Sequence, residues 1–295
     1  MKKFLNLIVL AGLLAALLFS AKPGLADPGS GEPPLKVFKI VLPIVSNSVG
    51  LSPNPIEPPA SKPIIKGPYY ESKVFAGTDF NFGTHDQAAG GSDIWPTTWG
   101  PDNNIYTSWG DGGGFGGSNS DGRVSLGFAR IEGMPGSFAG HNVWGGKNAE
   151  HLATFGGKTA GILSVDGVLY AWINTQNGNP PDFKLAWSTN LGASWSLSDW
   201  NFPSSGTFFP STFLQYGKDY AGARDGYVYS YGAKWTETQG PENNVYLMRA
   251  PKGSLRDRRA YEFFKGLDGS GKPTWSADIN QRQPVFSDPN GVGNN

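Results

Sequence analysis

Two aspartates in the aromatic-rich part of the chain could divide acid and base chemistry between them. Asp93 and Asp111 flank a stretch that predicts a β-hairpin turning at Asp102 and Asn103, since polar turn residues there separate two runs of strand-forming residues. In such a hairpin the numbers of paired residues sum to about 204, which sets Asp93 opposite Asp111. We therefore expect their β-carbons to lie roughly 5 Å apart.

Like charges that face each other across a strand pair destabilise a sheet, so this placement calls for a reason. Catalysis supplies one, because a carboxyl kept protonated by its charged neighbour can act as general acid while the neighbour acts as general base. A structural reason is equally open. Ser92-Asp93 and Asp111-Gly112 are ordinary turn sequences, in which the Asp side chain accepts hydrogen bonds from nearby backbone amides.

Five further residues could bind a substrate beside this pair. Trp95, Trp99 and Trp109 are expected to lie partly in the core and partly against sugar rings, because aromatic faces pack on the apolar faces of sugars. Lys158 precedes a predicted hairpin, and Arg249 follows a predicted strand. Each of these two cations could reach a central pocket, and each could equally be a solvated charge on the rim.

No motif in the sequence predicts a metal ion or a cofactor. His85, His141 and His151 lack the spacing of metal ligands, and the chain has no cysteine. The glycine-rich segment at residues 111–117 precedes a strand rather than a helix, so it does not form a helix-based phosphate cradle. The numbers of basic and acidic residues, 24 of each, suggest neither nucleic acid nor an anionic membrane surface as a partner.

The N-terminal region has the composition of an export signal. A basic start at Lys2 and Lys3 is followed by an apolar run at residues 4–19, which is shorter than the roughly 20 residues that span a bilayer. This pattern predicts a cleaved signal peptide at residues 1–26, and hence a secreted or cell-surface protein with no membrane attachment after cleavage. An uncleaved anchor is the alternative. Proline-rich residues 27–65 are typical of a disordered linker.

The remaining residues, 66–295, predict an all-β domain built from repeats. High glycine and aromatic content, with 42 Gly and 18 Phe in the chain, indicates many short strands joined by tight turns. Similar strand patterns recur about every 60 residues, and all-strand repeats of this kind are typical of β-propeller blades. A β-sandwich in which the spacing is coincidental is the alternative. Each repeat contains an aromatic strand and a second strand, at residues 104–109 and 124–129, 167–172 and 183–187, and 226–231 and 245–248.

One turn resembles a known structural motif. Residues 188–195, Ser-Thr-Asn-Leu-Gly-Ala-Ser-Trp, resemble the Asp-box of sialidase-type propellers, Ser-x-Asp-x-Gly-x-Thr-Trp, with Asn190 and Ser194 in the Asp and Thr places. In such a box a short polar side chain bonds backbone amides and the Trp packs between strands. Its expected role is therefore structural rather than catalytic.

A second resemblance covers most of the domain. Gly-Ser-Asp-Ile-Trp-Pro-Thr-Thr-Trp at residues 91–99 and Trp-Gly-Asp-Gly-Gly-Gly-Phe at residues 109–115 resemble the opening blade of the family catalogued as domain of unknown function 4185. The likeness continues in the segments at residues 105–106, 166–172, 214–220, 225–229 and 245–252. That family is similar to five-bladed sialidase-like propellers. Its characterised members are glycoside hydrolases that cut D-arabinan in mycobacterial cell-wall polysaccharides.

The resemblance implies a carbohydrate pocket at the propeller centre, with Asp93 in the place of the catalytic carboxylate. Asp111 matches the family's Gly-Asp-Gly loop, while its role as partner rests on the hairpin register. Because the sequence supplies three repeats and the start of a fourth, we expect about three and a half blades of a ring that is incomplete at its C-terminal end.

The expected function is therefore that of a secreted glycoside hydrolase acting on an extracellular polysaccharide. Arabinan is the substrate class that the resemblance implies. The alternative is a non-catalytic propeller that binds carbohydrate or serves in cell-surface adhesion, and the separation of the two carboxyls distinguishes these functions. Both hydrolytic geometries need the carboxyls within about 10 Å of each other.

Overall fold

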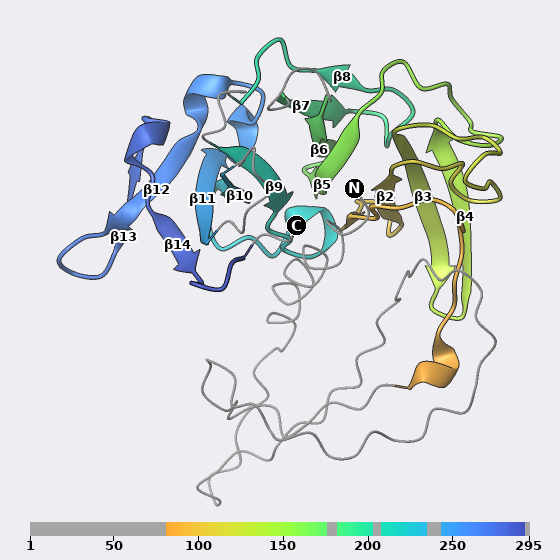
Figure 1. The fold of residues 1–295 in the computed structure, drawn as a ribbon, viewed down its shortest axis with the longest axis horizontal. Coiled ribbons are helices and arrows are strands. Elements are labelled where there is room, and N and C mark those ends of the chain that lie inside the picture. Colours follow the sequence, from red (N-terminus) through yellow and green to blue (C-terminus); the bar gives the residue numbers. More distant parts are fainter. Residues whose placement is uncertain (1–80, 176–181, 203–207, 235–242, 293–295) are drawn as a thin grey trace, which may run out of the picture.

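The computed structural model describes residues 81–175, 182–202, 208–234 and 243–292, and in these ranges the chain is all-β (Figure 1). Its helical turns there are five 3₁₀ segments of three residues each. The prediction of an all-β domain is therefore confirmed. The predicted signal peptide and linker lie outside the described residues.

The strands form three antiparallel sheets that follow one another along the chain. The first sheet contains, in spatial order, β1 (Thr97–Trp99), β2 (Ile105–Trp109), β3 (Gly127–Met134) and β4 (Ser137–Trp144). The second contains β5 (Lys158–Val165), β6 (Val168–Asn174), β7 (Phe183–Ser188) and β8 (Ser196–Leu197). The third contains β9 (Phe209–Phe213), β10 (Tyr227–Ala233), β11 (Asn244–Pro251), β12 (Glu262–Leu267) and β13 (Pro273–Ser276), and β14 (Pro284–Ser287) also pairs with β11.

The sequence repeat of about 60 residues corresponds to one sheet. The predicted aromatic strands are the second strands, β2, β6 and β10, and the strands predicted behind them are the third strands, β3, β7 and β11. Figure 1 shows the three sheets side by side in an arc. Along the inner side of this arc β5 contacts both β1 and β9, so each sheet begins with the strand closest to its neighbours.

Because each sheet is an antiparallel meander, its connections alternate between two ends. One end, here called the loop end, holds the residues before β1 and the β2–β3, β4–β5 and β6–β7 connections. The other, the turn end, holds the β1–β2, β5–β6 and β7–β8 turns. Neighbouring sheets share these ends: Lys158 at the start of β5 pairs with Asp111 after β2, and the Gly167 amide donates to Asp219 after β9.

Aromatic side chains fill the two interfaces between the sheets. Between the first and second sheets, Trp195 stacks on Phe128 with ring centroids 3.8 Å apart. Between the second and third, the fully buried Trp172 stacks on Phe213 at 5.3 Å and donates its indole N–H to the Ser230 hydroxyl at 2.9 Å. In a chain without cysteine, these packed rings hold the sheets together.

The Asp-box-like turn between β7 and β8 has the bonding that the sequence predicts. The Ser188 hydroxyl accepts from the Gly192 amide at 2.8 Å, and the Asn190 side chain accepts from the Ser194 amide at 2.9 Å. Trp195 follows the turn, is only 8% exposed, and donates its indole N–H to the Gly192 carbonyl at 3.1 Å. The turn thereby fixes the ring that joins the first two sheets.

Replacing this ring should be costly to stability. Trp195→Ala is expected to lower the free energy of unfolding by about 3–5 kcal/mol, because it empties a packed position between two sheets. Equilibrium urea denaturation checks this, with Trp99→Ala as the matched control. Trp99 is 44% exposed, so its replacement should change stability by only about 0.5 kcal/mol. Similar losses in the two variants would contradict the assigned role of Trp195.

Candidate functional site

The hairpin that begins the first sheet has the predicted register at its turn and a different one at its open end. Thr97 pairs with Thr107 and Trp99 with Ile105, as the hairpin prediction requires. Farther out, the Asp93 amide donates to the Gly110 carbonyl at 2.9 Å, and the Gly110 amide donates back at 2.7 Å. Asp93 therefore lies opposite Gly110, and the prediction that it pairs with Asp111 is wrong by one residue.

The cause of this shift is a bulge in the first strand. Three residues separate Asp93 from Thr97, whereas two separate Thr107 from Gly110, so the first strand has one residue more. Ile94 in this stretch has a φ of 57°, which a β-branched residue rarely adopts. Backbone strain of this kind is frequent at functional sites.

The two aspartates are nevertheless near each other, and the Lys158 side chain is near both. A Cβ placed on Gly110 would stand 3.3 Å from Asp93 Oδ1 and 3.3 Å from Lys158 Nζ. The same ammonium forms an ion pair with Asp111 Oδ1 and donates to the Ser125 carbonyl at 3.1 Å. Glycine at position 110 thus leaves open the space that adjoins both Asp93 Oδ1 and the Lys158 ammonium.

Asp111 faces two cations. Besides Lys158, Arg123 Nη2 lies 3.2 Å from Asp111 Oδ1, and Arg123 Nη1 donates to the Asp111 carbonyl at 2.8 Å. The Lys158 side chain is 17% exposed, whereas the Asp111 and Arg123 side chains are about two-fifths exposed. Asp111 therefore faces two cations on one side and solvent on the other.

Asp93 has the opposite surroundings. Its Oδ1 atom is buried and, among the described residues, has no hydrogen-bond partner. Burial raises the pKa of Asp93, the charge of Asp111 raises it further, and Lys158 and Arg123 act against both effects. A buried polar atom without a partner is uncommon in folded proteins, so this oxygen calls for a functional explanation.

The turn-capping alternative does not describe these two side chains. Within the described ranges, no backbone amide donates to the carboxylate of Asp93 or of Asp111. Asp102, by contrast, is a true turn residue, since it accepts from the Asn104 amide at 3.2 Å and from the Tyr106 hydroxyl at 2.8 Å. The aspartate pair and the turn aspartate therefore have different roles in one hairpin.

The structure separates the three predicted tryptophans. Trp95 is half-buried and stacks on Trp109 with centroids 5.6 Å apart, while the edge of Phe115 meets it at 5.5 Å. Trp109 is fully buried, so it supports Trp95 and has no surface for a ligand. Trp99 is exposed but ends β1 at the turn end, away from Asp93. Only Trp95 combines exposure with a place at the loop end.

Arg249 is not brought to the carboxylate pair. It lies on β11, two strands out from the inner strand β9, near the turn end of its sheet. Its guanidinium stands 4.0 Å from the ring centroids of both Tyr227 and Trp275, and it pairs with Glu262 Oε2 at 2.9 Å. These partners hold Arg249 inside its own sheet. Arg123, which the sequence interpretation did not single out, takes the place of the second cation.

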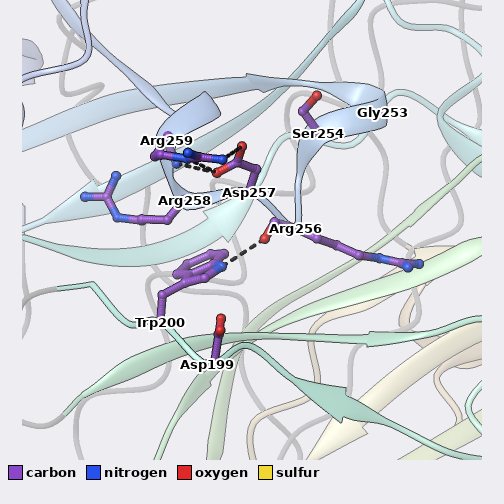
Figure 2. Close-up of a pocket in the computed structure, with 8 residues that line it drawn as sticks. All are labelled: Asp199, Trp200, Gly253, Ser254, Arg256, Asp257, Arg258 and Arg259. Carbon is purple, nitrogen blue, oxygen red and sulfur yellow. Dashed lines mark hydrogen bonds and ion pairs between the residues drawn. The ribbon is translucent and has the colours of Figure 1, made fainter.

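A hollow of about 720 Å³ lies apart from this site, between the segment after β8 and the segment between β11 and β12. Figure 2 shows three arginines along it, and the side chains of Arg256 and Arg258 point in opposite directions. Arg259 pairs with Asp257 at 3.1 Å. The guanidinium groups therefore do not converge on one anion.

Two kinds of feature are absent from the described part of the chain. No three His, Asp or Glu side chains gather there in a way that could hold a metal ion. No helix in the described ranges is long and apolar enough to cross a membrane.

Comparisons with known proteins give a distant likeness among solved structures. No protein-family model matches the chain, and no curated protein matches it. Among solved structures, the chain is similar to a protein from Bacteroides ovatus named a "putative hydrolase", with 14% sequence identity and a TM-score of 0.38. The alignment covers 66% of this chain and 56% of that protein, so the chain spans little more than half of that protein's length.

Proposed function

We propose that this chain is a glycoside hydrolase acting on an extracellular polysaccharide, with Asp93 and Asp111 as the acid and base of the pair. The observation that supports this most strongly is the buried, unpartnered Asp93 Oδ1 beside a carboxylate that faces two cations. A pair of carboxyls in unlike surroundings, one buried and one facing cations, is the arrangement that glycosidases use.

The chemistry follows from the two environments. Burial raises the pKa of Asp93 and so favours the protonated form, which a general acid needs in order to donate to the leaving oxygen of a glycosidic bond. The charged Asp111 can accept a proton from the attacking water. The closeness of both carboxyls to Lys158 supports a separation within the roughly 10 Å that both hydrolytic geometries require.

We also propose that the three sheets are consecutive blades of a sialidase-like propeller of the five-bladed type, as in domain of unknown function 4185. The strand order within each sheet and the contacts of β5 with β1 and β9 support this arrangement. Export through residues 1–26 remains part of the proposal. The N-terminal sequence of protein recovered from the culture medium tests it.

A polysaccharide release assay tests the proposed activity. The purified chain is incubated with plant, fungal and mycobacterial polysaccharides, arabinan among them, and new reducing ends are counted. Release from at least one glycan is expected. Tight binding without release would favour the alternative, a carbohydrate-binding or adhesion module.

The pH profile should depend on Lys158. Lys158→Met removes a charge that lowers the pKa of Asp93, so Asp93 should hold its proton to higher pH and the alkaline limb of the kcat profile should move upward. Lys147→Met is the control, because Lys147, in the β4–β5 connection, pairs with Asp121 and forms no ion pair with Asp93 or Asp111. An alkaline limb that stays in place in Lys158→Met would contradict the assignment of Asp93 as acid.

A further inference from the structure

A second hollow adjoins the carboxylate pair. Its volume is about 380 Å³, at the lower end of the roughly 300–1,000 Å³ of small-ligand pockets. Ser125 belongs to both places, since its carbonyl accepts from Lys158 at 3.1 Å and its hydroxyl accepts from the Gly157 amide at 3.3 Å. The residues that line the hollow are Ser125, Phe155, Gly156, Gly157, Thr175, Lys184 and Leu197.

The hollow opens at the same end of the molecule as the aspartates. Gly156 and Gly157 directly precede β5, Thr175 directly follows β6, and Lys184 is the second residue of β7. All of these positions lie at the loop end. A glycan that crosses Asp93 and Asp111 can therefore extend into the hollow without passing to another face.

Lys184 brings a positive charge to the hollow. Its side chain is half-buried and, in the part of the chain that the structure describes, its ammonium has neither an ion pair nor a hydrogen-bond acceptor. The nearest acidic residue along the chain is Asp182, two residues before Lys184. The contact that Asp182 makes with the hollow is through its backbone, whose carbonyl accepts from the Thr175 amide at 3.0 Å. A partly desolvated cation without a partner is best balanced by an anionic group on a ligand.

Another part of the lining of the hollow suits a sugar ring. Phe155 is half-buried and packs on Trp144 with ring centroids 4.9 Å apart, so its position is fixed. An aromatic ring next to hydroxyl and amide groups offers both the apolar face and the hydrogen bonds that a sugar uses. A single ammonium beside them matches one negative charge.

We propose that this hollow is a subsite for a sugar residue that bears one negative charge, a carboxylate or a sulfate ester, next to the bond that the aspartate pair cleaves. The proposal rests on the proposed hydrolase function. It deepens that function by making the substrate an acidic polysaccharide, with Lys184 as a specificity-determining residue and Phe155 as the stacking surface.

Binding to the full-length Asp93→Asn protein tests the subsite without turnover. The probes are oligogalacturonates with their carboxyl-reduced counterparts, and sulfated galactan oligosaccharides with their desulfated counterparts. In at least one pair the charged member should bind about tenfold more tightly, as one charge-assisted hydrogen bond predicts. The pair that shows this preference identifies the carboxylate or the sulfate ester.

Substitutions at Lys184 make the test specific. Lys184→Gln should remove the tenfold preference and leave the uncharged probe unaffected, while Lys184→Arg should keep most of it. Lys265→Gln on β12, an exposed lysine of the third sheet, is the matched control and should change nothing. Charged probes that bind no better than their neutral partners, or a preference that survives Lys184→Gln, would overturn the subsite.

The outcomes for the subsite and for the hydrolase function can be separated. Charge-dependent binding that needs Lys184, in a protein that releases no sugar, would support the subsite and refute the hydrolase function. Cleavage of an acidic polysaccharide with the same KM in the wild type and in Lys184→Gln would support hydrolysis and refute the subsite.

Discussion

Asp93→Asn is expected to remove glycan cleavage while making the folded protein more stable at pH 7. The amide has nearly the shape of the carboxyl but has no proton to donate, so kcat should fall by about 10²–10⁴-fold. Stability should rise by about 0.5–2 kcal/mol, because the amide carries no charge, whereas burial makes the Asp93 carboxylate costly. Loss of function with gain of stability is the mark of a residue kept for chemistry.

The pH dependence of this gain has a definite sign. Because the pKa of Asp93 is raised in the folded protein, the folded state holds its proton more tightly than the unfolded chain does. The stability that Asp93 contributes is therefore full below the unfolded pKa of about 3.9 and is lost as the pH rises through the folded value. The advantage of Asp93→Asn should appear across that window and vanish in acid.

Urea denaturation of the two proteins at several pH values measures this difference. Asp121→Asn serves as the control, because Asp121 pairs with Lys147 in an exposed loop. A variant that is less stable than the wild type at pH 7, or that still cleaves glycan at the wild-type rate, would remove Asp93 from the role of acid.

Asp111→Asn should also lose activity but should change stability in the opposite direction. Without its charge, the attacking water has no base, so kcat should again fall by about 10²–10⁴-fold. Here the substitution leaves Lys158 and Arg123 without their carboxylate. Since the side chain of Asp111 is 41% exposed, the loss of stability should be about 1 kcal/mol.

The two isosteric variants are thus matched controls for each other. The same denaturation and release measurements apply to both, and the account requires a shared loss of rate with stability changes of opposite sign. If Asp111→Asn were as stabilising as Asp93→Asn, the ion pairs of Asp111 with Lys158 and Arg123 would not stabilise the folded protein, and the account would be wrong.

The strands were predictable where local chemistry specifies them. Aromatic and β-branched residues after a polar turn give β2, β6 and β10, and in two of these sheets the turn aspartate also bonds a strand tyrosine. Asp102 accepts from Tyr106 at 2.8 Å, and Asp225 accepts from Tyr229 at 2.6 Å. Because such signals lie within five residues, periodicity and turn chemistry suffice to find them.

The site was predictable only in part, since its geometry depends on contacts between distant residues. The hairpin register fails at Asp93 because Ile94 adopts a positive φ, which β-branched residues normally avoid and which no neighbouring residue signals. Arg123 and Lys184 belong to no sequence motif. Their places near Lys158 and Ser125 become visible only in the folded chain, where the β2–β3, β4–β5 and β6–β7 connections lie at the loop end. The sequence likewise did not distinguish the buried Trp109 from the exposed Trp99.

The most direct test of the central claim is the release of reducing ends by the wild type and by the Asp93→Asn, Asp111→Asn double variant, measured side by side on the same set of acidic and neutral polysaccharides. Both substitutions keep the shape of the site. Any release by the double variant is therefore background that does not depend on the two carboxyls. We predict release by the wild type from at least one polysaccharide and none above background by the double variant. Equal release by the two proteins, or none by either, would contradict the account.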